Sequence, residues 1–199
     1  MEILIATANS GKLVEFAQML GELPLELRDL AHYGIGESVD EIGETFSENA
    51  ALKASTYARL AGIPALADDS GLVIDYLHGA PSVRSARFAG EGASDNDRIE
   101  KVLLKMRSAP DDERKARFVC SVALSDRDGN IVAITEATCE GFIATSAKGS
   151  NGFGYDPVFV PDGFDQTFAE LPAEIKNNIS HRRKAVAKII PSLQGFFKI

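Results

Sequence analysis

The sequence contains few cysteines and no long apolar segment. Its 199 residues include two cysteines, Cys120 and Cys139, which are too few for a disulfide scaffold or for a metal site of their own. We therefore expect both to be core thiols. No apolar run approaches the roughly 20 residues of a membrane-spanning helix, and the N-terminal MEILIATANSGK lacks the features of a secretory signal. These absences predict no membrane partner and a cytoplasmic location.

An excess of basic residues is also missing. The chain has 21 Lys and Arg against 29 Asp and Glu, a net charge of −8. Nucleic-acid-binding proteins ordinarily present a basic surface, so no nucleic-acid partner is expected. A small polyanionic substrate is compatible with this charge, because it needs only local cations, backbone N–H groups or a metal ion.

Strand and helix patterns alternate along the chain without an internal repeat or a long linker. Residues 3–6 form a short apolar run, which a polar loop and a helical pattern follow. Thr45 and Glu48 have the spacing of a capping box at the start of a second helix, which Gly62 can end. We expect one domain spanning residues 1–199.

Two later strand-like runs, 116–124 and 131–138, are joined by DRDGN, which predicts a hairpin turn. Because the start of the chain favours parallel pairing and the hairpin requires antiparallel pairing, an α/β fold with a mixed sheet is predicted. Ser94 is expected to cap a third helix, and Ser180 a last one.

The loop TANSGK, residues 7–12, lies between the first strand and the first helix. Backbone N–H groups at a helix N-terminus bind anions readily, and Thr7, Asn9, Ser10 and Lys12 add hydrogen-bonding groups and a charge. The spacing differs from that of a Walker A loop. A capped helix start with a surface lysine is an equally good interpretation.

The segment PALADDSGLVIDYL, residues 64–77, places Asp68 and Asp69 within an apolar run. We expect two short strands around DDSG, with a turn at Ser70-Gly71. Ionised carboxylates are costly to bury unless they are paired or bind a metal. Since side chains alternate across a strand, the two acids should face opposite ways, with Asp69 serving the site and Asp68 holding the turn or a lysine.

Further acids precede and begin the second helix. Mg²⁺ prefers a few carboxylate oxygens together with waters and substrate phosphates, so one acid of the pair Asp40-Glu41 and one acid of DDSG would suit it. Acids at a helix start also favour the helix dipole without any metal. For Glu48 that second interpretation is preferred, because the capping box already uses its side chain.

The glycine-rich GSNGFGYD would let the backbone approach a ligand closely. Phe153 and Tyr155 offer aromatic faces for a base, although aromatic side chains that fill the core are the more ordinary interpretation. The basic cluster at 181–184 opposes the dipole of the expected last helix, so compensation is expected; it is either a solvated face or a recognition site for carbonyl oxygens or phosphates. Lys53 could point to the same site or be an ordinary snorkelling lysine.

Five motifs occur in an order that resembles the inosine/xanthosine triphosphate pyrophosphatases: TANSGK, TFSENAALKA, ADDSGL, NGFGYDP and ISHR. The resemblance extends from about residue 3 to about residue 190. Each motif is weak alone, whereas the ordered set is specific. The chain departs from the family where Asp40-Glu41 replaces a frequent Glu-Glu, where Ala8 replaces a common glycine, and at Ser150-Asn151.

The resemblance implies an elongated two-lobed α/β fold with a central substrate cleft, a Mg²⁺ cofactor and a homodimer. Asp69 would be the catalytic acid–base residue and a metal ligand, together with Asp40 or Glu41; the departure at this pair leaves open which one. The residues implied in substrate binding are Thr7, Ala8, Asn9, Ser10, Gly11, Lys12, Lys53, Ser70, Phe153, Gly154, Tyr155, Asp156, Lys176, His181 and Arg182.

The implied activity is Mg²⁺-dependent hydrolysis of ITP, dITP and XTP to the monophosphate and pyrophosphate, which cleanses the pool of non-standard purine nucleotides. Three alternatives remain: a related pyrophosphatase for modified pyrimidines or methylated bases, a phosphatase that uses Asp68 or Asp69 as nucleophile, and a non-catalytic nucleotide sensor. Against the phosphatase, the chain has D-D-S rather than D-x-D after a strand.

Overall fold

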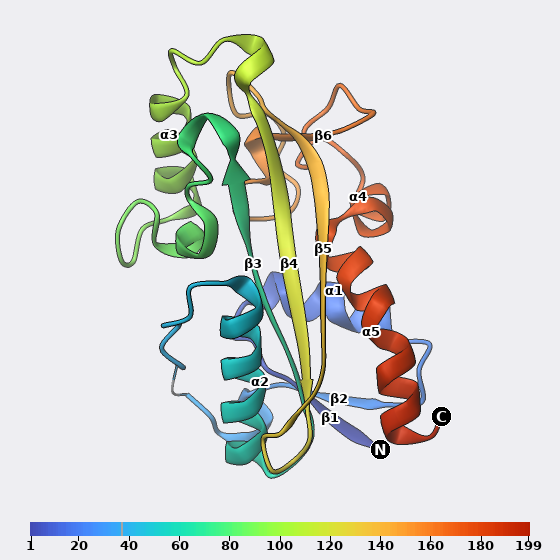
Figure 1. The fold of residues 1–199 in the computed structure, drawn as a ribbon. Helices are drawn as coiled ribbons and strands as arrows, with labels where there is room; N and C mark the ends of the chain where they lie inside the picture. Colours follow the sequence, from blue (N-terminus) through green and yellow to red (C-terminus); the bar gives the residue numbers. More distant parts are fainter. Residues whose placement is uncertain (37) are drawn as a thin grey trace. The chain divides into compact units, whose positions relative to one another are not determined.

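A computed structural model describes residues 1–36 and 38–199 (Figure 1). Its strands are β1 (Glu2–Ile5), β2 (Glu26–Arg28), β3 (Ala65–Ile74), β4 (Lys115–Ser125), β5 (Ile131–Ile143) and β6 (Phe159–Pro161). Its α-helices are α1 (Ser10–Leu20), α2 (Phe46–Ala61), α3 (Asp95–Lys105), α4 (Ala173–Ile179) and α5 (His181–Phe197). Short 3₁₀ turns occur at Ala31–Tyr33, Asp75–Leu77, Ser82–Arg87, Asp111–Glu113 and Asp156–Val158.

The strands form one mixed sheet in the order β2-β1-β3-β4-β5-β6. β1 pairs in parallel with both β2 and β3, whereas β5 and β6 pair antiparallel. The predicted mixed α/β class is confirmed. The hairpin turn at DRDGN is also confirmed, since Gly129 N donates to Asp126 O at 3.1 Å.

The chain divides into two compact units. The first comprises Met1–Asp69, Cys120–Ala137 and Arg182–Ile199, and the second comprises Ser70–Val119 and Thr138–His181. Strands β3, β4 and β5 each continue along the chain from one unit into the other.

In the first unit, alternate residues of β1 face different helices. Ile3 and Ile5 belong to a core cluster with α1 and α5, while Leu4 and Ala6 belong to a cluster with α2. The cluster at α2 is rich in alanine, so this helix can approach the sheet closely. The sheet is thus covered by helices on both faces within this unit (Figure 1).

The helix starts follow the sequence closely. Thr45 and Glu48 form the predicted capping box of α2, which ends at Gly62 with φ +70°. Ser94 caps α3 in the same way, with Asp97 as its partner. Ser180 directly precedes α5.

The second unit has an aromatic core. Phe118 and Phe159 meet edge to face with ring centroids 4.7 Å apart, and Phe168 lies 5.2 Å from Phe159. Ile99 and Val102 of α3 belong to the same cluster.

Three further expectations can be compared with the structure. The interruption at DDSG was wrong: β3 runs without a break through Asp68, Asp69, Ser70 and Gly71, because the buried charges find partners and no turn is needed. Helix α4 was not anticipated. Cys120 and Cys139 are buried free thiols, as predicted.

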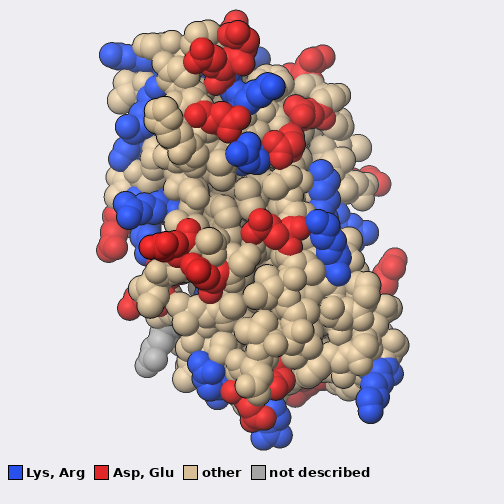
Figure 2. All heavy atoms as spheres, viewed as in Figure 1, with Lys and Arg blue, Asp and Glu red and all other residues tan. Residues whose placement is uncertain are grey.

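Two observations relate to the expectation of no membrane partner and no nucleic-acid partner. Among the described residues, no helix has the length and apolarity to cross a membrane. Figure 2 shows acidic and basic side chains interspersed over the visible face of the molecule, without a continuous basic surface there.

Candidate active site

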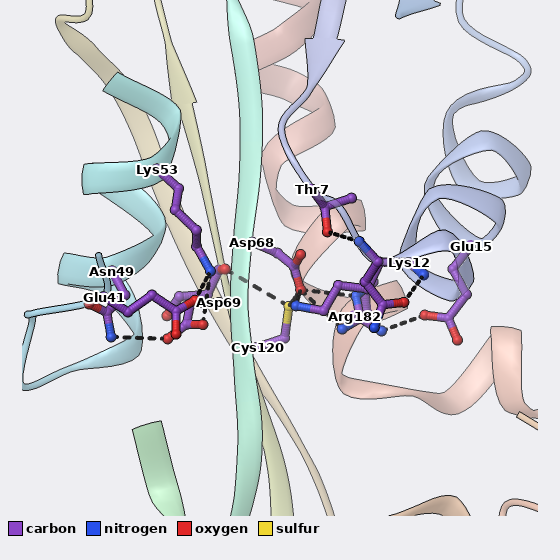
Figure 3. Close-up of polar contacts among 12 residues, drawn as sticks. Thr7, Lys12, Glu15, Glu41, Asn49, Lys53, Asp68, Asp69, Cys120 and Arg182 are labelled. Atoms are coloured by element: carbon purple, nitrogen blue, oxygen red, sulfur yellow. Dashed lines mark hydrogen bonds and ion pairs between the residues drawn. The ribbon is translucent and has the colours of Figure 1, made fainter. Parts of the chain in front are cut away.

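Asp68 and Asp69 lie on opposite sides of β3 (Figure 3). Leu66 belongs to the core cluster with α1 and α5, whereas Ala65 and Ala67 belong to the cluster with α2. The same alternation directs Asp68 toward α1 and α5, and Asp69 toward α2. The predicted opposite orientation of the two acids is confirmed, and each has its own set of partners.

Asp69 is held by two residues of α2 that are one turn apart. Lys53 Nζ lies 3.0 Å from Asp69 Oδ1, and Asn49 Nδ2 donates to Asp69 Oδ2 at 3.2 Å. Lys53 Nζ also lies 2.8 Å from Glu41 Oε1. Two carboxylates from distant parts of the chain therefore converge on one ammonium group.

Burial and neighbouring charge perturb both members of this pair. Burial raises the pKa of Asp69, Glu41 raises it further, and the attraction of Lys53 only partly opposes them. For Lys53, burial works against the charged form, but the Asp69, Asp68 and Glu41 carboxylates outweigh it and raise the pKa of the ammonium. The cluster accordingly attracts positive charge.

This geometry bears on the predicted metal ligands. Glu41 and Asp69 share a cation, whereas Asp40 is exposed, so the arrangement favours Glu41 over Asp40 as the partner of Asp69. Within the described residues, no three His, Cys, Asp or Glu side chains gather as a complete metal site. Two carboxylates suit Mg²⁺, which usually takes its other ligands from water and substrate phosphates. The metal role of these residues stays a prediction.

Asp68 lies among cations and is 2% exposed. Its Oδ2 accepts from Lys12 Nζ at 2.9 Å and from Arg182 Nε and Nη2 at 3.1 and 3.0 Å. Burial alone would raise the pKa of Asp68, but Lys12 and Arg182 outweigh it and hold that pKa far below its usual range. Arg182 also pairs with Glu15, and the Cys120 thiol lies 3.8 Å from Asp68 Oδ2.

These contacts show how the buried charges are compensated. The expectation that Asp68 holds a lysine is confirmed by its ion pair with Lys12. The compensation expected for the basic cluster is provided, for Arg182, by Asp68 and Glu15. The guanidinium of Arg182 is turned toward these two acids, and its role in substrate binding stays a prediction.

The TANSGK loop forms the start of α1. Asn9 is the N-cap and its Oδ1 accepts from Lys12 N at 3.0 Å, while Thr7 Oγ1 accepts from Asn9 N at 3.2 Å. The capped helix start is therefore confirmed. Phosphate binding by Thr7, Ala8, Asn9, Ser10, Gly11 and Lys12 stays a prediction, since capping and anion binding use the same kind of helix end.

In the second unit, Asp156 organises the glycine-rich loop. Its Oδ2 accepts from Phe153 N at 2.9 Å and from Lys176 Nζ at 2.6 Å. Lys176 Nζ lies 4.6 Å from the centre of the Phe153 ring, within the range of a cation–π contact. The structure thus brings together three of the residues predicted to bind substrate, Phe153, Asp156 and Lys176.

The other residues of this unit that were predicted to bind substrate make different kinds of contact. The Tyr155 hydroxyl donates to Ser85 O at 2.8 Å and the side chain is part of the aromatic core, so the ordinary interpretation holds for this residue. The His181 ring stacks on Phe118 with centroids 4.7 Å apart. Gly154 N donates to the Asp95 carboxylate at 2.7 Å, and Ser70 is half-buried within β3.

Sequence reasoning missed Glu15 and the contact of Cys120 with Asp68. Glu15 is a charged residue directly beside Phe16 on the buried side of α1, so an acid at an apolar helix position was an available signal. No signal in the sequence could have indicated the cysteine contact, because it depends on which strand lies beside β3.

Comparison with known proteins agrees with the motifs. The model of the Ham1 family matches residues 3–192. The chain belongs to the Ham1 family. A dITP/XTP pyrophosphatase of Bacillus cereus is 44% identical over 197 residues, covering 98% of this chain and 96% of the relative. The dITP/XTP pyrophosphatase of Geobacillus kaustophilus is 46% identical over 188 residues, covering 94% and 92%.

Solved structures show the same likeness. A HAM1 protein from Coxiella burnetii has a TM-score of 0.88 and 41% identity, covering 98% of this chain and 99% of that one. The Staphylococcus aureus Ham1 protein has a TM-score of 0.86 and 38% identity, with the same coverage. The resemblance noted in the sequence is confirmed.

Proposed function

We propose that this protein hydrolyses non-standard purine nucleoside triphosphates to the monophosphate and pyrophosphate. It is a nucleoside triphosphate pyrophosphatase, a hydrolase acting on acid anhydride bonds. ITP, dITP and XTP are its substrates, and Mg²⁺ is its cofactor. The relatives named dITP/XTP pyrophosphatase support the substrate class. The observation that carries the proposal is the convergence of Glu41 and Asp69 on the half-buried Lys53.

Four charged residues handle the triphosphate: Lys12, Glu41, Lys53 and Asp69. Glu41 and Asp69 would hold a Mg²⁺ ion, which would supply positive charge to neutralise the phosphate oxygens. Lys12 and Lys53 add fixed positive charge toward the phosphates. Asp69 orients the attacking water and accepts its proton. Attack at the α-phosphorus releases pyrophosphate as one unit.

Three other residues, Phe153, Lys176 and His181, recognise the base. Hypoxanthine and xanthine present a 6-oxo acceptor, whereas adenine presents a 6-amino donor. Lys176 and His181 supply N–H donors, and Phe153 supplies an aromatic face. Facing an adenine amino group, such donors would be unpaired, which costs roughly 1–3 kcal/mol for each buried group.

One assay tests the function directly. The protein is incubated with ITP, XTP, GTP, ATP and dUTP in the presence of Mg²⁺, and the released phosphate species is identified. We expect pyrophosphate from ITP and XTP, and much slower turnover of ATP. Orthophosphate as the primary product would overturn the pyrophosphatase assignment, and preferred turnover of dUTP would support the pyrimidine alternative.

Two further properties complete the proposal. The protein is a homodimer, which light scattering coupled to gel filtration tests. Its location is the cytoplasm, which fractionation of the source cells tests.

A further inference from the structure

Glu15 is a buried acid on α1, three residues after Lys12, and is 7% exposed. Its neighbour Phe16 is fully buried in the core of the first unit. An ionised carboxylate in such surroundings requires a charged partner. Arg182 supplies that partner (Figure 3), and its side chain is 2% exposed.

Arg182 divides its guanidinium between two acids. Nε and Nη2 contact Asp68 Oδ2, while Nη1 contacts Glu15. Arg182 is the second residue of α5, where the helix dipole disfavours a cation. Its position therefore depends on both acids, and the planar shape of the guanidinium links them rigidly.

The same Asp68 oxygen also holds Lys12. Oδ2 accepts from Lys12 Nζ at 2.9 Å as well as from Arg182, whereas Oδ1 has no hydrogen-bond partner within the part of the chain that the structure describes. Two cations compete for one oxygen. Glu15 accepts from one nitrogen of Arg182 and balances part of its positive charge, so Asp68 is able to hold Lys12 as well.

We infer that Glu15 is a positioning residue: through Arg182 and Asp68, it fixes the Lys12 ammonium where that group meets the triphosphate. The side chain of Lys12 is 15% exposed, so its end can reach both Asp68 and a bound anion. This inference rests on the proposed function only in taking Lys12 as a phosphate-binding residue; it does not require turnover.

The test measures binding of inorganic tripolyphosphate by isothermal titration calorimetry, a probe without base or sugar. Wild type is compared with Glu15→Gln, which keeps the shape and an acceptor but removes the charge. Glu22→Gln is the matched control, because Glu22 is an exposed acid just beyond α1. The decisive pair is Lys12→Met alone and Lys12→Met combined with Glu15→Gln.

We expect Glu15→Gln to weaken tripolyphosphate binding by roughly five- to tenfold, and Glu22→Gln by less than about twofold. In the Lys12→Met background the Glu15 change should have no further effect, because residues that act through one another are not additive. Glu15→Asp should restore part of the affinity. Thermal melting of each variant checks that it is folded.

Three results would overturn the inference: unchanged binding in Glu15→Gln, the same fold-loss with and without Lys12, or no tripolyphosphate binding by the wild type. If the wild type binds tripolyphosphate but does not hydrolyse ITP, the proposed function fails while the binding series still decides the role of Glu15.

Discussion

The same substitution at the two adjacent aspartates should change the free energy of unfolding by very different amounts. Asp68→Asn removes the counter-charge of two cations, the buried Arg182 and the half-buried Lys12. An amide keeps one acceptor oxygen, but its NH₂ group cannot face the guanidinium. Breaking a buried ion pair by removing one partner costs about 3–5 kcal/mol. We expect a loss of this size in the free energy of unfolding, and a fall of roughly 10 °C in Tm for a chain of this length.

Asp69→Asn is the matched comparison. Because the pKa of Asp69 is raised in the folded protein, its ionised form is disfavoured there, and an amide removes that cost. The amide oxygen can still accept from Lys53, which retains Glu41 as its counter-charge. We expect a stability change within about 1 kcal/mol, together with a large loss of ITP hydrolysis.

Urea denaturation of metal-free protein measures both effects. The chain has no tryptophan, so circular dichroism follows the transition better than fluorescence. Because the pKa of Asp68 is lowered in the folded protein, its ionised carboxylate stabilises the fold fully above the ordinary aspartate pKa of about 3.9, and this stabilisation is lost as the pH falls. The difference in the free energy of unfolding between wild type and Asp68→Asn should therefore become smaller below about pH 4. Equal destabilisation by the two substitutions at pH 7 would refute this reasoning.

Three other outcomes follow from the structure. Glu41→Gln should raise the Mg²⁺ concentration for half-maximal activity about tenfold, and Asp40→Asn far less; similar effects of both would contradict the preference for Glu41. Burial raises the pKa of the Cys120 thiol, so iodoacetamide should label it only after unfolding; mass spectrometry of native and denatured samples decides this. Gly149 has φ +79°, and an added Cβ would lie 2.3 Å from the Ala169 carbonyl, so Gly149→Ala should cost about 1–3 kcal/mol in urea denaturation. An unchanged unfolding midpoint would refute that last expectation.

Local features were predictable where a short stretch of chain carries its own physical signal. The capping box of Thr45 and Glu48 and the turn at Gly129 depend on residues within four positions of one another. The opposite orientation of Asp68 and Asp69 follows from strand alternation alone. The family followed from the order of the motifs, which is a property of the sequence.

The interruption at DDSG shows where such reasoning ends. The sequence indicated that two acids were too costly for a continuous strand, and it could not show that Lys53 and Arg182 would lie beside them. These partners are 16 and 114 residues away along the chain. A local sequence pattern indicates that burying a charge is costly, but it does not show which distant residues will pair with that charge.

The sequence by itself determined the mixed α/β class, the helix caps and the family. Only the tertiary structure decided that Glu41 rather than Asp40 shares a cation with Asp69, and that Arg182 lies between Asp68 and Glu15 and pairs with both. The reason is physical. Caps and strand alternation arise from neighbouring backbone geometry, whereas the partner of a buried charge is chosen by which elements the folded core brings together.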